Sequence, residues 1–176
     1  QIKQIENLVN EFSDFARMPK PIFSKNNLVD IMQESIKLLK ELDNSIEIKF
    51  LYNPEKIILK SDKDQLNRVF FNLIKNSIES IQQKAENISN FEKKITIELN
   101  QVNAHIQLII IDNGTGFGLL EKNIKDILNP YFTTKKNGTG LGLSIVNKII
   151  NDHNGKIKFI SIDDGAKITV DFVGQL

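Results

Sequence analysis

The sequence has no cysteine and only two histidines, His105 and His153. Without cysteine the chain forms no disulfide, no zinc–cysteine site and no thiol nucleophile. No apolar run approaches the roughly 18 residues that a membrane-spanning helix needs. The 23 basic and 22 acidic residues nearly cancel to a net charge of +1, which argues against a dedicated nucleic-acid surface.

Regular hydrophobic patterning is present instead, over 176 residues, a length that suits one globular domain with a short appendage. The N-terminal segment follows the spacing of a helix-pairing seam, at Ile2, Ile5, Val9, Phe12 and Ala16. An amphipathic helix that lies on its own domain is the alternative. Pro19 and Pro21 end this helix, because proline lacks an N–H and disfavours helix in the residue before it. We therefore divide the chain into an appendage, residues 1–18, and one domain, residues 19–176.

The periodicity further along the chain predicts helices and strands. A spacing of three and four predicts helices over 27–42, 62–84 and 141–152. Alternation of apolar and polar residues predicts a half-buried strand over 45–52. Further strands are expected over 56–60, 94–102, 105–112, 156–162 and 166–173. A single sheet covered by helices on one face, an α+β sandwich, is the simplest arrangement of these elements.

The helix predicted over 62–84 carries polar side chains along one edge of its apolar face. Gln65, Asn72 and Asn76 are spaced seven and four residues apart, so they lie on one line. The amide oxygens of Asn72 and Asn76 are suitable ligands for Mg²⁺, which prefers oxygen and commonly combines few protein ligands with substrate phosphates. A solvated polar stripe in an Asn-rich sequence explains the same pattern.

A predicted strand ends at Asp112, which is followed by Gly114 and Gly116. The strand delivers a carboxylate into a turn whose glycines permit positive φ and a close approach of the backbone. Such a carboxylate can accept a hydrogen bond from an exocyclic amine, for example that of adenine. An ordinary glycine-rich hairpin with an aspartate in its turn is the alternative.

A second glycine-rich segment, with Gly138, Gly140 and Gly142, leads straight into the last predicted helix. Successive backbone N–H groups at a helix start bind anions, and Lys135 and Lys136 add positive charge just before them. The segment matches neither the Walker A loop nor the dinucleotide-binding fingerprint. A flexible glycine hinge is the alternative.

The order of these three segments is more specific than any one of them. In this order the sequence resembles the histidine-kinase ATP-binding domain of the GHKL superfamily (gyrase, Hsp90, histidine kinase, MutL), and most of all the nitrogen-regulation sensor kinases of the NtrY/NtrB type. Residues 72–76 are similar to the N box, 112–116 to the G1 box, 129–135 to part of the ATP lid and 138–143 to the G2 box. The resemblance extends over roughly residues 24–174.

The resemblance implies a Bergerat-type fold, which is a two-layer α/β sandwich with a mixed sheet, and it implies ATP and Mg²⁺ as cofactors. It assigns Mg²⁺ to Asn76, the phosphate region to Asn72 and the adenine amine to Asp112, with Gly114 and Gly116 shaping the adenine pocket. The remaining nucleotide contacts fall to Phe132, Lys135, Lys136, Gly138, Thr139, Gly140, Leu141 and Gly142. Asn76 and Lys135 are the residues expected to serve catalysis.

Two positions bear on the reaction. Many sensor kinases carry a lysine where this chain has Glu79, so the neutralisation of the phosphates shifts to Lys135 or Lys136. Hydrolytic members carry a glutamate where this chain has Asn72. Because an amide is no general base, we expect slow ATP hydrolysis and favour the kinase over a hydrolase.

The acceptor histidine is expected outside the chain, because His105 opens a predicted strand and His153 ends a predicted helix. We therefore expect a fragment that begins inside the second dimerisation helix, holds the donor half of the reaction and is inactive alone. Its expected partners are its own dimerisation domain, a response regulator and, in the full-length protein, a second copy, and its expected place is the cytoplasmic side of an inner-membrane sensor kinase. A non-catalytic module of the same fold that works by helix pairing through residues 1–17 is the alternative.

Overall fold

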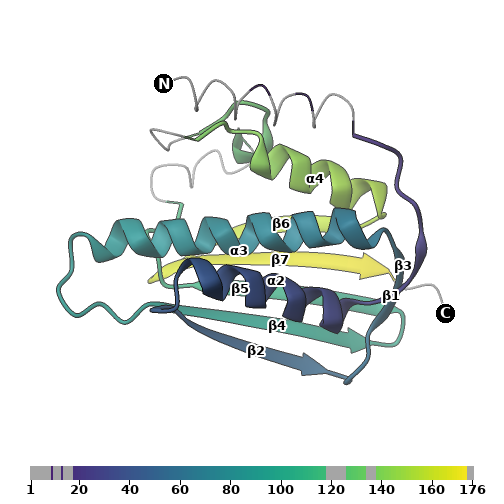
Figure 1. Ribbon diagram of the computed structural model, residues 1–176, viewed down its shortest axis with the longest axis horizontal. Helices are drawn as coiled ribbons and strands as arrows, with labels where there is room; N and C mark the ends of the chain where they lie inside the picture. The colour runs from purple at the N-terminus through teal and green to yellow at the C-terminus, as the bar shows by residue number, and fades with distance from the viewer. Residues whose placement is uncertain (1–8, 10–12, 14–17, 118–125, 134–137, 174–176) are drawn as a thin grey trace.

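The computed structural model describes residues 9, 13, 18–117, 126–133 and 138–173 and contains a mixed five-stranded sheet (Figure 1). The strands lie in the order β2 (Glu47–Asn53), β4 (Lys94–Val102), β5 (His105–Asp112), β7 (Gly165–Val173) and β6 (Lys156–Ile162). β2 runs parallel to β4, whereas the other neighbouring strands are antiparallel. The mixed sheet expected from the resemblance is therefore confirmed.

Helices cover one face of this sheet, as Figure 1 shows: α2 (Leu28–Leu42), α3 (Lys63–Ala85) and α4 (Gly142–Asp152). The strand residues that face the helices are buried and alternate with half-buried ones on the other face; in β4 the buried ones are Ile95, Ile97 and Leu99. These side chains form one core with the apolar faces of the helices. The predicted two-layer α+β sandwich is confirmed.

Predicted strands over 94–102, 105–112 and 156–162 match β4, β5 and β6 residue for residue. β4 and β5 are joined through Asn103, whose φ of 55° suits a tight hairpin turn. The strand predicted over 166–173 begins one residue earlier, because Gly165 is the first residue of β7.

The cap residues explain why α2 and α3 begin one residue after their predicted starts. The Asn27 side chain accepts a hydrogen bond from the backbone N–H of Val29 (3.2 Å), and Asp62 accepts one from that of Gln65 (3.0 Å). Both cap residues have extended backbone dihedrals, so each precedes its helix instead of joining it.

The prediction of a single sheet is wrong in one respect. A short strand that the periodicity does not reveal, β1 (Ser24–Asn27), pairs with β3 (Ile58–Ser61) in a separate two-stranded antiparallel sheet. β1 has no apolar residue and therefore no alternation to detect. Its pairing depends on distant contacts, such as the hydrogen bond from Asn26 Nδ2 to the Ser61 carbonyl (2.8 Å).

Most of the predicted N-terminal helix, with its heptad spacing, lies outside the described residues, and Val9 and Ser13, which are described, are helical. The linker that follows docks on the start of α3. Gln65 Nε2 donates to the Pro19 carbonyl (3.1 Å), and the Ile22 backbone N–H donates to Asp62 (2.8 Å). Within the part of the chain that the structure describes, no helix combines the length and the apolar character that crossing a membrane requires.

Candidate functional site

Asn72 and Asn76 lie one turn apart on α3, and both are half-buried. The amide nitrogen of Asn72 donates to the Arg68 carbonyl of the same helix (2.9 Å). Its oxygen Oδ1 faces α4, at 3.4 Å from the point that a Cβ on Gly142 would occupy. The structure therefore brings together the first and third segments predicted from the sequence. Gln65, which was expected on the same line, is instead buried beneath the linker.

Asp112 is the last residue of β5 and is only 3% exposed. The Ser77 hydroxyl on α3 donates to its Oδ2 (2.8 Å), and the Gly114 backbone N–H donates to its Oδ1 (3.0 Å). A carboxylate offers about four acceptor positions, so both oxygens keep the capacity to accept further bonds. A buried carboxylate of this kind suits an amine donor such as that of adenine.

Opposing influences act on the pKa of Asp112. Burial is the largest and raises the pKa, because the charged carboxylate loses its hydration. The Gly114 N–H and the Ser77 hydroxyl lower the pKa, and so does the charge of Lys84. The net result is a pKa above the ordinary value, as is common for carboxyl groups in ligand sites.

The glycines after Asp112 are required by the packing of their turn. A Cβ on Gly114 would lie 2.3 Å from Ser80 Oγ and 2.7 Å from the Ser80 carbonyl carbon. Gly116 has a φ of +66°, and a Cβ there would lie 2.7 Å from the Gly165 carbonyl oxygen. The turn is thus packed closely between α3 and β7.

The segment before α4 packs backbone to backbone against the lid residues that precede it. The Tyr131 N–H donates to the Gly140 carbonyl (3.0 Å). Gly140 has a φ of +70°, and a Cβ there would lie 2.4 Å from the Tyr131 carbonyl carbon and 2.7 Å from Phe132 N. Phe132 is half-buried and packs against the core. The described part of the lid is therefore in direct contact with the G2-box segment.

The start of α4 has no side-chain cap and no acidic residue in its first turn. The N-cap residue Leu141 is fully buried, and its own N–H donates to Thr139 Oγ1 (3.4 Å). Uncapped N–H groups and the helix dipole both favour an anion at this end. Gly138, which is exposed, and Gly142 flank this position. Lys135 and Lys136 lie outside the described residues.

Ser77 is a site residue that the sequence pattern fails to reveal. Its side chain lies on the apolar face of α3 and is 1% exposed. A usable signal exists, because a buried hydroxyl on an apolar helix face needs a partner inside the protein. That partner is Asp112, which is 35 residues away in the sequence.

His153 ends α4, as predicted, and is buried. Its Nε2 accepts the backbone N–H of Asp62, the N-cap residue of α3 (3.0 Å). Nδ1 therefore carries the hydrogen and donates to the Ile149 carbonyl (2.8 Å). His105 is exposed at the start of β5, with Nε2 at 3.2 Å from Asp171 Oδ1.

Comparison with known proteins gives three results. Residues 61–174 match the family model described as histidine kinase-, DNA gyrase B-, and HSP90-like ATPase. The chain is 32% identical over 169 residues to the nitrogen regulation protein NtrY of Azorhizobium caulinodans, a likeness that covers 94% of the chain and 21% of that relative. The solved catalytic domain of the histidine kinase ThkA is similar with a TM-score of 0.75 and 29% identity, over 87% of this chain and 96% of that one.

A further solved structure, the histidine kinase ThkA in complex with the response regulator protein TrrA, has a similar fold. Its TM-score is 0.75 at 24% identity, over 99% of this chain and 48% of that one. The chain spans about a fifth of the length of NtrY, since it covers 21% of that protein.

Proposed function

Because the chain belongs to the histidine kinase-, DNA gyrase B-, and HSP90-like ATPase family, as the ATP-binding catalytic domain of a sensor histidine kinase, we propose how its residues hold ATP and Mg²⁺ and present the γ-phosphate to a histidine outside the chain. The observation that carries this proposal is that α3 contacts both ends of the site. Ser77 on α3 holds Asp112, while Asn72 on α3 lies beside Gly142 at the start of α4. A nucleotide that reaches from Asp112 to α4 would lie along one rigid helix.

We assign the adenine amine to Asp112. Ionised, this carboxylate only accepts hydrogen bonds, so it favours the amine of adenine and repels the carbonyl of guanine. A charge-assisted hydrogen bond of this kind contributes on the order of 1.5–3 kcal/mol. Gly114 and Gly116 are assigned to the same pocket, which they shape by letting the turn that holds Asp112 pack closely on α3 and on Gly165.

We assign the phosphates to the start of α4 and to the lid. The residues involved are Asn72, Phe132, Lys135, Lys136, Gly138, Thr139, Gly140, Leu141 and Gly142. Mg²⁺, when bound, neutralises phosphate charge as a Lewis acid, and Asn76 is its assigned protein ligand. The donor set fits this ion, because the half-buried amides of α3 supply oxygen ligands beside a helix start that favours phosphate.

The proposed reaction needs positioning and charge neutralisation more than a base on this chain. Asn72 cannot accept a proton from water, so water is a poor nucleophile at this site. The imidazole that attacks the γ-phosphate comes from the dimerisation domain. Asn76 and Lys135 act as the catalytic residues by orienting and neutralising the phosphates.

We also propose the division of the chain. Residues 1–18 form the end of a dimerisation helix, and residues 19–176 form the catalytic domain. The likeness to NtrY covers 94% of the chain and so extends well before the family match at 61–174, which supports a catalytic domain that begins before residue 61. In the longer protein the domain would work in a homodimer on the cytoplasmic side of the membrane. The complex of ThkA with TrrA supports a response regulator as the final acceptor.

Titration of the chain with ATP and Mg²⁺ tests the proposed site. Wild-type protein should bind with micromolar to millimolar affinity, and combining Asp112→Asn with Asn76→Ala should abolish binding. Undiminished binding by this double variant would show that the site is wrongly assigned.

Transfer is tested by mixing the chain with a separate fragment that carries an H box and adding radiolabelled ATP. Label on the histidine of that fragment supports the kinase reaction. Absence of label, with ATP binding intact, would favour the non-catalytic helix-pairing module. Rapid phosphate release without the fragment would indicate a hydrolase.

A further inference from the structure

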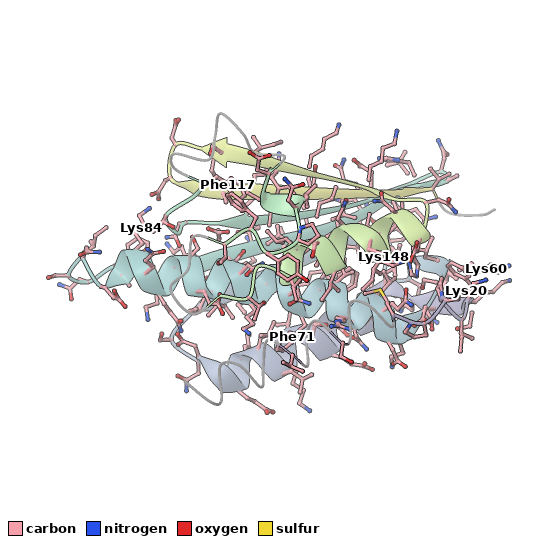
Figure 2. The ribbon with its side chains drawn as sticks, turned by 90° about the horizontal axis from the view of Figure 1, so that it is seen from above. Lys20, Lys60, Phe71, Lys84, Phe117 and Lys148 are labelled. Atoms are coloured by element: carbon pink, nitrogen blue, oxygen red, sulfur yellow. The ribbon has the colours of Figure 1, made fainter. Side chains whose placement is uncertain are left out.

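Three polar residues of α3 bind the turn that follows β5. Ser77, Ser80 and Lys84 are spaced three and four residues apart, so they lie on one face of the helix. We call them the α3 clamp. Figure 2 shows Lys84 at the C-terminal end of α3. None of the three was singled out by the sequence motifs, and the proposed contacts with ATP do not use them.

Each member of the α3 clamp holds a different part of the turn. Ser77 donates to the Asp112 carboxylate (2.8 Å), and Ser80 Oγ accepts the Thr115 backbone N–H (3.0 Å). Lys84 Nζ donates to two backbone carbonyls of the turn, those of residues 113 and 114, at 3.0 Å each. Four consecutive residues, 112–115, are therefore each bonded to α3.

Lys84 is itself held in place. Its ammonium forms an ion pair with Asp164 in the β6–β7 turn and lies 5.3 Å from the centre of the Phe91 ring. Its side chain is only 20% exposed, whereas a solvated surface lysine would be far more open. An isolated surface ion pair contributes about 0–1 kcal/mol and would not order a long side chain on its own. The two carbonyl contacts give Lys84 a defined position relative to the turn.

The fit between helix and turn leaves little freedom. A Cβ on Gly114 would lie 2.3 Å from Ser80 Oγ and 2.8 Å from the backbone nitrogen of Ile81. The turn therefore rests directly on the backbone of α3, and the helix that carries Asn72 and Asn76 also sets the position of Asp112.

We propose that the α3 clamp is a set of positioning residues that determines selectivity for adenine. It fixes the orientation of the Asp112 carboxylate. It also fixes the position of the adenine end of the site relative to the phosphate end. This inference rests on the proposed function, because it takes Asp112 as the group that meets the base. Without the clamp, Asp112 can turn away from an amine, and preference for adenine falls while affinity for phosphate does not.

The test compares three ligands with the whole chain: ATP, inosine triphosphate and inorganic triphosphate, each with Mg²⁺. Inosine triphosphate carries a carbonyl in place of the adenine amine, and inorganic triphosphate lacks a base. We expect Lys84→Met to weaken ATP binding about tenfold and to reduce the preference for ATP over inosine triphosphate by a similar factor. Binding of inorganic triphosphate should stay unchanged, and Lys84→Arg should restore the preference, because arginine can donate to both carbonyls.

Lys63→Met is the matched control. Lys63 lies on the same helix and pairs with Glu34 (3.0 Å) at the surface, far from the turn. It should leave all three affinities as in the wild type. Should Lys84→Met fail to fold, Ser80→Ala supplies the same comparison, because it removes the hydrogen bonds of Ser80 to the Thr115 N–H and hydroxyl and leaves Lys84 in place.

Two results would overturn this proposal. One is an equal loss of ATP and inorganic triphosphate binding in Lys84→Met. The other is an unchanged preference for ATP over inosine triphosphate in a folded Lys84→Met or Ser80→Ala variant. Failure of the proposed function looks different. In that case the wild-type chain itself binds no ATP or prefers inosine triphosphate.

Discussion

The side-chain oxygen of Asn72 on α3 lies 3.4 Å from the point where a Cβ on Gly142, the first residue of α4, would stand. That distance is an ordinary contact, so the fold accepts a methyl group at Gly142. Phosphates assigned to the same junction would lose space to that methyl group. A substitution at Gly142 can therefore change ATP affinity without lowering the stability of the fold.

We expect Gly142→Ala to weaken ATP binding about tenfold while leaving the midpoint of thermal unfolding equal or higher. Alanine is favoured over glycine in a helix by up to about 1 kcal/mol, and the added methyl group makes only an ordinary contact with Asn72. Calorimetric titration and thermal melts measure the two effects. Gly140→Ala is the contrast, because its φ of +70° and a contact at 2.4 Å predict a clear loss of stability. Normal ATP affinity in Gly142→Ala would contradict the phosphate assignment.

Affinity for ATP should depend on pH through Asp112. Burial raises the pKa of this carboxyl, against the hydrogen bonds from Gly114 and Ser77 and the charge of Lys84. The ionised form accepts from the adenine amine through a stronger, charge-assisted hydrogen bond than the protonated form, so affinity falls as the pH drops through the raised pKa. Titrations across a pH series check this, with inorganic triphosphate as the ligand that lacks the amine. Parallel pH curves for both ligands would show that Asp112 is not responsible.

The raised pKa of Asp112 also makes the stability of the fold depend on pH. This dependence runs opposite to that of ATP affinity, because stability falls as the pH rises. Since the folded chain holds the Asp112 proton more tightly than the unfolded chain, the stability contributed by this proton is fully present below the unfolded pKa. It is lost as the pH rises through the folded pKa. We therefore expect Asp112→Asn to unfold at an equal or higher temperature than the wild type at neutral pH. A large loss of stability in this variant would mean that the carboxylate is needed for folding.

Local patterns were sufficient to predict much of this fold. β5 is an apolar run that begins at His105 and ends at Asp112, and its bounds match the prediction; in the structure its side chains alternate between buried and less buried positions. The glycines and amides in a fixed order predicted which segments would meet, and the structure places Asn72 Oδ1 beside Gly142. That these residues bind a nucleotide stays a prediction.

Contacts between distant segments were not predictable from local patterns. β1 exists because Asn26 reaches Ser61, and Asp112 is held because Ser77 reaches it; each pair is separated by 35 residues. A single serine is also too small to interrupt the apolar periodicity of a helix face, so the pattern does not single it out. Only the packing of α3 against β5 shows that it is a partner.

Asp62 should stabilise the start of α3 in a pH-dependent way. We expect Asp62→Ala to lower the free energy of unfolding by about 1–2 kcal/mol, because it removes the acceptor for the Gln65 N–H at the helix cap. It also removes the acceptor for the Ile22 N–H of the linker. Denaturant unfolding at neutral pH measures the loss. Asp64→Ala is the control, since it removes an acidic residue from the first turn without removing the cap, and should cost about 0.5 kcal/mol or less.

Acid should remove the contribution of the Asp62 cap to the free energy of unfolding. Burial is the largest single influence on Asp62 and raises its pKa, but the N–H groups of Gln65 and Ile22, with smaller contributions from Asp64 and His153, bring the pKa below its ordinary value. A lowered folded pKa gives stability that is present above the unfolded pKa and is lost as the pH falls through the folded pKa. The difference between wild type and Asp62→Ala should therefore shrink in strong acid. A difference that is constant from neutral pH to strong acid would exclude the ionised carboxylate as its source.

His153 should be structural, not a phosphoacceptor. Its Nε2 accepts the Asp62 N–H, and its ring packs edge to face on Phe23 with centroids 5.1 Å apart, so that it joins the end of α4 to the start of α3. His153→Ala leaves that part-buried N–H without its acceptor and should lower the free energy of unfolding by about 1–3 kcal/mol. His105→Ala, at an exposed position, should change it by no more than about 0.5 kcal/mol. Below its unfolding temperature, His153→Ala should still transfer label from ATP to an H-box fragment. Label that appears on the isolated wild-type chain and is absent from His153→Ala would instead identify His153 as the acceptor.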